Sequence, residues 1–162
     1  MNTLLITGCM AKFGVPSTHA MLSGADGKQT DIGTIALYRD DRAIARLIGV
    51  PLLAPDSTPR TIGKITHAWA DGEFLLIEGE IADTPGARYW LTQAYCGLCS
   101  TFRIPQGVPH GRTELSADDF FIEAVRITRP GQSGFAESWV NLKDSTIRYQ
   151  PQQYVNPLLS KF

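Results

Sequence analysis

Residues 60–83 read RTIGKITHAWADGEFLLIEGEIAD, and this stretch decides the fold. Two runs rich in β-branched and aromatic residues, RTIGKITHAWA and EFLLIEGEIAD, flank the dipeptide Asp71-Gly72, which is a strong signal for a tight hairpin turn. In the second run, apolar residues alternate with glutamates, as in a strand with one buried face (Leu75, Ile77 and Ile81 against Glu78 and Glu80). We therefore expect an antiparallel hairpin with one face towards a core.

The sequence on either side of this hairpin predicts further strands and two helices. We expect strands over 3–13, 98–104 and 119–130, a short buried run over 50–56, and helices over 36–49 and 83–95. Gly49 is a plausible end for the first helix, and Asp83 or Thr84 can cap the second. Because strands dominate, we predict an α+β fold, mainly an antiparallel β-barrel, closed or half-closed, with about two helices.

Size and composition indicate a single folded domain. The chain has 162 residues, and we assign 1–142 to the domain and 143–162, which are polar and rich in Gln and Pro, to a C-terminal arm. The net charge of −1 gives no basis for nucleic acid or an anionic membrane as the main partner. No run of eighteen apolar residues and no signal peptide is recognisable, and three cysteines argue against a disulfide framework, so we expect a cytosolic setting.

The stretch AYCGLCSTF (94–102) holds two cysteines, Cys96 and Cys99, at the spacing of a metal or redox pair. A structural zinc site needs four ligands, whereas His19, His67 and His110 are scattered singly and no second cysteine pair exists. A thioredoxin-type pair begins at a helix N-terminus, whereas this pair follows the second predicted helix. We therefore expect no metal and no cofactor, and the simplest interpretation makes both cysteines small buried residues.

Two further side chains stand out on the predicted strands. His67 shares a strand face with Ile65 and Trp69, which is typical of a packed, hydrogen-bonded core residue. Glu123 shares a face with apolar residues, so it needs a partner or a raised pKa, unless it lies at an edge and reaches water. Elsewhere, His110 is expected in a solvated loop, and the cluster YRDDR (38–42) on a solvated helix face.

Several short stretches, in order, resemble the prohead protease family of tailed phages. These serine proteases mature procapsids, and their fold is similar to that of herpesvirus assemblin. The resemblance spans most of residues 4–140 and is carried by ITGCMAKFG (6–14), PLLAPD (51–56), TIGKIT (61–66), EFLLIEGEI (73–81), DTPGARYWL (83–91), AYCGLCSTFRI (94–104) and FFIEAVRITRPGQSGFA (120–136).

This chain departs from the family at the residues that would carry catalysis. The family's catalytic histidine falls on Pro55, so that Asp56 alone remains of its His-Asp pair. The nucleophilic serine falls on Cys99 and the serine before it on Cys96, while Ser100 could serve if the register slipped by one. Cysteine can replace serine as a nucleophile, but loss of the base typically lowers turnover by about a million-fold.

The resemblance and its departures together predict a non-catalytic head protein of a tailed phage. Such a protein would decorate or cement the capsid, or assist its assembly, on a degenerate protease scaffold. It would be made in the bacterial cytoplasm, reside in the virion, bind the major capsid protein or other head subunits, and form a homo-oligomer.

Two alternatives remain at this stage. The chain could be an active maturation protease, with Cys99 as nucleophile, His67 as base and Glu123, which falls on an acidic position of the family, as support. Alternatively, the resemblance is accidental and the chain is another small β-rich binding module with an exposed apolar patch.

Overall fold

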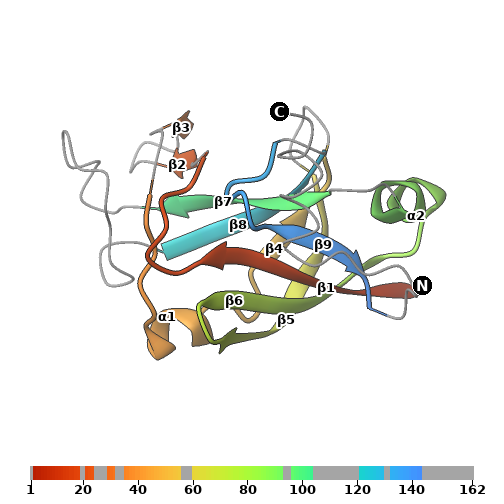
Figure 1. Ribbon diagram of the computed structural model, residues 1–162. Helices are drawn as coiled ribbons and strands as arrows, with labels where there is room; N and C mark the ends of the chain where they lie inside the picture. Colours follow the sequence, from red (N-terminus) through yellow and green to blue (C-terminus); the bar gives the residue numbers. More distant parts are fainter. Residues whose placement is uncertain are drawn as a thin grey trace, which may run out of the picture.

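The computed structural model describes residues 2–18, 21–23, 29–31, 35–55, 60–92, 96–103, 121–129 and 132–143 (Figure 1). The predicted arm from residue 144 onwards therefore lies outside the described residues, as do His19, Asp56 and His110. In chain order the elements are β1 (Thr3–Lys12), β2 (Met21–Ser23), β3 (Gln29–Asp31), α1 (Asp41–Ala45), β4 (Pro51–Leu53), β5 (Thr61–Asp71), β6 (Phe74–Ala82), α2 (Pro85–Thr92), β7 (Gly97–Arg103), β8 (Phe121–Thr128) and β9 (Trp139–Leu142).

All of these strands belong to one curled sheet. Its order is β3-β2-β7-β8-β4-β5-β6-β1-β9. Most neighbours are antiparallel, and the pairs β2–β7 and β4–β8 are parallel. The predicted fold class, mainly antiparallel β with two helices, is confirmed.

The hairpin predicted over 60–83 forms one of the two long pairings of the sheet, together with the pairing of β1 and β6. β5 and β6 are antiparallel from Gly63↔Ile81 to Asp71↔Phe74, and Gly72 in the turn has a φ of 58°. Ile65, Leu75, Ile77 and Ile81 face the interior, where they join other fully buried side chains. The alternation in the sequence thus correctly predicted which face of β6 is buried.

The segment before β9 closes the curled sheet onto β7. The backbone amide of Val140 donates to the carbonyl of Cys96 (3.1 Å), and that of Gly134 donates to the carbonyl of Leu98 (2.9 Å). Figure 1 shows β9 lying between β1 and β7. The Ser138 hydroxyl, which is fully buried, accepts from the Leu98 amide (2.9 Å) and donates to the Cys9 carbonyl (2.9 Å). One side chain therefore ties β7 to β1.

Replacing Ser138 by alanine is expected to lower the free energy of unfolding by about 2 kcal/mol. The change leaves the Leu98 amide and the Cys9 carbonyl buried with one hydrogen-bond partner fewer. Urea unfolding checks this value. The matched variant Ser17→Ala removes another buried hydroxyl that accepts a single amide bond, from Ile35 (2.8 Å), and should cost less. Equal losses for the two variants would contradict the bridging role.

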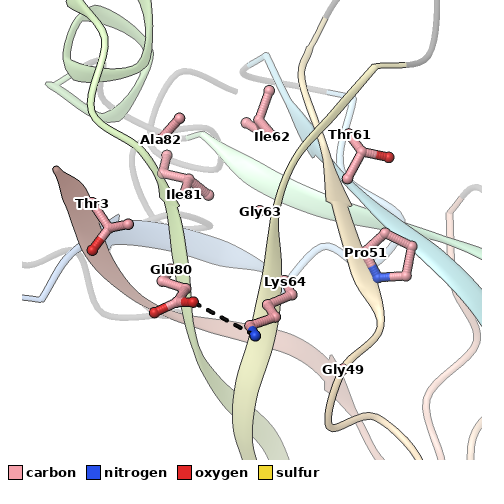
Figure 2. A pocket seen from close by; sticks show the side chains of 10 residues that line it. All are labelled: Thr3, Gly49, Pro51, Thr61, Ile62, Gly63, Lys64, Glu80, Ile81 and Ala82. Carbon is pink, nitrogen blue, oxygen red and sulfur yellow. Dashed lines mark ion pairs between the residues drawn. The ribbon is translucent and has the colours of Figure 1, made fainter. Parts of the chain in front are cut away.

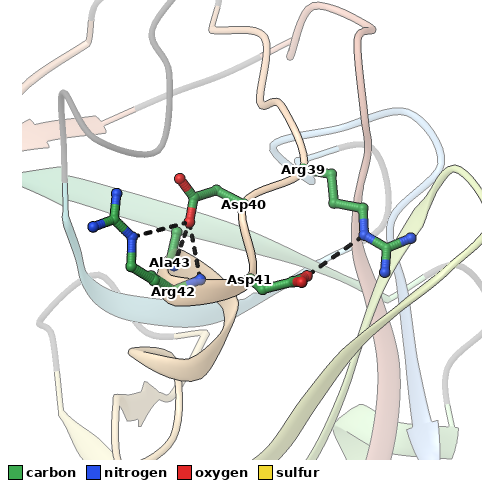
Figure 3. A network of polar contacts seen from close by, with 5 residues as sticks. All are labelled: Arg39, Asp40, Asp41, Arg42 and Ala43. Carbon is green, nitrogen blue, oxygen red and sulfur yellow. Dashed lines mark hydrogen bonds and ion pairs between the residues drawn. The ribbon is translucent and has the colours of Figure 1, made fainter.

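Helix α1 is shorter than the sequence predicted. The helix expected over 36–49 forms only over Asp41–Ala45, and residues 46–49 are turns. Before the helix, Ile35, Ala36 and Leu37 are buried, Ala36 forms a β-bridge with Pro16, and the amide of Gly14 donates to the Leu37 carbonyl (2.8 Å). Asp40 then caps α1, accepting from the amides of Arg42 and Ala43 (Figure 3). The bond from the Ala43 amide is the main reason why the pKa of Asp40 is lowered.

The cluster YRDDR therefore spans the helix cap and the first turn of α1, and it is largely exposed, as the sequence predicted. Arg39 pairs with Asp41 across the cap at 3.6 Å, in an exposed position (Figure 3). Helix α2 follows its prediction more closely, since the Thr84 hydroxyl accepts from the Ala87 amide (3.0 Å) and Asp83 pairs with Arg88 (2.7 Å). Neither described helix is long and apolar enough to cross a membrane.

Candidate functional site

Strand β7 places Cys99 and Ser100 on opposite faces of the sheet. Ser100 shares the core-facing side with Leu98 and Phe102, whereas Cys99 lies on the outward side opposite Arg126 of β8. Both side chains are buried, with 4% of Cys99 and 8% of Ser100 exposed. A nucleophile at Ser100 would therefore point into the core, so Cys99 is the better candidate of the two.

The strand pairing brings the expected base position towards Cys99. β8 pairs with β4 on its other side, and Leu53 of β4, Arg126 of β8 and Cys99 of β7 are consecutive partners across the three strands. Pro55 follows two residues after Leu53, half-buried at the end of β4. Strands about 4.8 Å apart put β4 and β7 about 10 Å from each other. The position that the resemblance assigns to the base thus follows β4, and the nucleophile position lies on β7, with β8 as the one strand between them.

Cys96 has a structural role at the end of α2. Its thiol donates to the carbonyl of Trp90 (2.9 Å), and its own carbonyl accepts from Val140. Burial raises the pKa of Cys96 to about 11, so the sulfur stays protonated near neutral pH. Cys9, Cys96 and Cys99 are all buried and form no disulfide, in agreement with the interpretation of the pair as small buried residues. Within the described part of the chain, no group of three or more His, Cys, Asp or Glu side chains could hold a metal ion.

His67 lies far from Cys99 in the sheet. β5 is separated from β7 by β4 and β8, which corresponds to about 14 Å at ordinary strand spacing. The predicted core position of His67 is wrong, because a bulge between Ile65 and His67 turns the histidine to the outward face, where it is exposed. Its Nδ1 lies 3.3 Å from the Thr66 hydroxyl. His67 is the one histidine among the described residues.

Glu123 reaches solvent because of a second bulge. Thr101 pairs with Ala124 and Phe102 with Ile122, which leaves Glu123 as the extra residue of β8. The predicted face shared with Val125 and Ile127 is therefore wrong, since those two are fully buried and Glu123 is exposed. The other interpretation, in which the Glu123 carboxylate reaches water, agrees with this exposure. The reason is the bulge in β8, however, and not a position at the edge of the sheet. The structure thus does not bring Cys99, His67 and Glu123 together.

Arg126 is a residue of this region that sequence reasoning missed. It pairs with Cys99 on one side and with Leu53 on the other, and it is half-buried. The sequence could have pointed to Arg126, because the residue stands between Val125 and Ile127 in a strand with one buried face. The alternation of such a strand predicts that the Arg126 side chain points outward. Its guanidinium supplies a positive charge but no proton acceptor.

Comparisons with known proteins give little beyond the fold. No family model matches the chain, and none of the curated proteins matches it. Among solved structures, the chain is similar to the protease of Kaposi's sarcoma-associated herpesvirus in complex with a dimer disruptor, at 11% identity and a TM-score of 0.39. The match covers 96% of this chain and 88% of that one. A similarity at this level supports no conclusion about activity.

Proposed function

We propose that this chain is a non-catalytic head protein of a tailed phage, acting in capsid decoration, cementing or assembly on a degenerate prohead-protease scaffold. One observation carries the proposal: Leu53, two residues before Pro55, and Cys99 are both cross-strand partners of Arg126, and the position that resembles the family's base holds a proline. The spatial grouping supports the resemblance, and the residue identities argue against catalysis.

The chemistry of these residues explains why hydrolysis is not expected. A cysteine nucleophile needs a proton acceptor or a depressed pKa. The pyrrolidine ring of Pro55 accepts no proton, and Arg126, which faces Cys99 across the strand pair, offers hydrogen-bond donors and no acceptor. With 4% of its surface exposed, Cys99 also gives a peptide bond little access.

The proposed partners are the major capsid protein or other head subunits, together with further copies of the chain itself. Residues 143–162, which are polar and rich in Gln and Pro, have a composition suited to an arm along a neighbouring subunit. The proposed location is the virion, after synthesis in the bacterial cytoplasm.

Quantitative mass spectrometry of purified phage heads tests this function. A decoration or cement protein should be present in many copies and uncleaved in the mature particle. An assembly protein should be present in procapsids in comparable numbers. If both particles lack the chain, or if it occurs as self-cleaved fragments, the proposal fails.

The outward position of Cys99 beside Arg126 supports a second candidate, a cysteine protease that matures the procapsid. Co-expression of the chain with the major capsid protein separates the two functions. Trimming of the capsid protein that Cys99→Ala abolishes and Cys96→Ala retains would favour the protease. An untrimmed capsid protein, with slow alkylation of Cys99 at neutral pH, is the expected result.

A further inference from the structure

One broad face of the sheet carries exposed apolar and charged side chains together. We use the term outer face for the outward side chains of β1, β6 and β5, namely Leu5, Lys64, His67, Trp69, Leu76, Glu78 and Glu80. Leu5, near the start of β1, is 47% exposed, and Trp69, near the end of β5, is 37% exposed. These exposures show that neither of the described helices covers the face.

The charges of the outer face are balanced. Lys64 pairs with Glu80 at 3.8 Å, and Lys143, which follows β9, pairs with Glu78. Figure 2 shows the Lys64 and Glu80 side chains reaching towards each other between β5 and β6. Lys64 keeps 59% of its side chain exposed and Glu80 keeps 36%, so both can also meet charges from outside. A pair of opposite charges that lies on either side of a two-fold axis meets the opposite charges of a second copy.

A hollow lies next to the Lys64–Glu80 pair. It has a volume of about 490 Å³ and is lined mainly by apolar surface of β1, β4, β5 and β6, including Thr3, Pro51, Ile62 and Ala82 (Figure 2). Gly63 lies at its centre and contributes no side chain, which helps to leave the space open. Leu5 is the cross-strand partner of Glu80, so an exposed apolar side chain and an apolar hollow flank the same ion pair.

We propose that the outer face is a two-fold contact between two copies of this chain. In a two-fold contact, if one residue of the first copy contacts a second residue of the other copy, the same pair also meets with the two copies exchanged. An axis close to the Lys64–Glu80 pair sets Lys64 of each copy against Glu80 of the other, and Leu5 of each copy beside the hollow of the other. Charge complementarity thus favours a second copy of the chain as the partner that binds the outer face. A partner with a strong net charge of either sign would gain little there, because the charges of the face are balanced. The contact does not depend on a role in a phage head.

Charge reversal in the full chain tests the contact by sedimentation equilibrium. The unmodified chain should be a dimer, and Lys64→Glu or Glu80→Lys should each weaken dimerisation by about tenfold or more, because like charges then meet across the axis. An equimolar mixture of the two variants should form heterodimers about as tightly as the unmodified chain. Within a heterodimer, both intermolecular pairs are again of opposite charge.

Arg88→Glu is the matched control. It reverses a charge in an exposed pair on α2, a helix that contributes no residue to the outer face or to the lining of the hollow, and it should leave dimerisation unchanged. Circular dichroism establishes that each variant is folded, and a variant that unfolds is replaced by Lys64→Gln or Glu80→Gln. The proposal is overturned by an unmodified chain that stays monomeric at about 0.1 mM, by a mixture that does not form heterodimers, or by equal weakening in Arg88→Glu.

Discussion

Replacing Gly63 by alanine is expected to lower the free energy of unfolding by about 4 kcal/mol, a large part of the roughly 5–15 kcal/mol that holds a domain together. A Cβ atom at this position would lie 1.9 Å from the Glu80 carbonyl oxygen and 2.7 Å from the Ile81 Cα. Both atoms are backbone of β6, so no side-chain rotation can relieve the contact. The two strands would have to separate where the ladder between β5 and β6 begins.

Gly86→Ala is the matched control for this prediction. Gly86 lies in α2, and a Cβ atom there would meet its nearest neighbour, the Trp90 ring, at 3.7 Å, an ordinary contact. Alanine in a helix is favoured over glycine, so stability should stay constant or rise by up to about 1 kcal/mol. Urea unfolding followed by tryptophan fluorescence measures both variants. A loss below about 1 kcal/mol for Gly63→Ala would contradict the predicted close approach.

Local sequence patterns predicted the parts of the fold that are determined by residues close together in the sequence. The hairpin of β5 and β6 was recognisable because alternation and the Asp71-Gly72 turn agree with each other. The strand β9 was missed, because its four residues are held by partners more than a hundred residues away, such as Gly8 for Val140. The first half of the helix expected over 36–49 was wrong, because burial of Ile35 and Leu37 outweighed helix periodicity.

The candidate site was predicted less well, and two bulges explain why. A single extra residue reverses the face of every side chain beyond it, and no residue type marks such an insertion. This moved His67 from the predicted core to solvent, and it separated Glu123 from the face of Val125 and Ile127. Arg126 was missed because its importance comes from its neighbours on β4 and β7 and not from its own strand.

The buried thiol of Cys9 should make the protein lose stability in alkaline solution. Burial, reinforced by the negative charge of Glu137, raises the pKa of Cys9 from 9.0 to about 12, although a hydrogen bond to the Ala11 backbone opposes the shift. The folded chain therefore keeps this proton at a pH where the unfolded chain has lost it. Below about pH 9 both states are protonated and stability is complete, and above it ionisation favours the unfolded chain.

Ionisation of Cys9 in the unfolded chain lowers the free energy of unfolding by about 1.4 kcal/mol for each pH unit, so about 2 to 3 kcal/mol of stability should be lost between pH 9 and pH 11. Other groups, Cys96 among them, also ionise in alkaline solution, and the variant Cys9→Ala separates their contributions because it retains them all. The variant starts less stable, since it leaves a small cavity where the sulfur was fully buried. Urea unfolding at several pH values should then show the stability of the unmodified chain falling more steeply than that of the variant, until the two curves approach each other near pH 11. Parallel curves over the whole range would mean that the Cys9 thiol ionises as readily in the folded protein as in the unfolded chain.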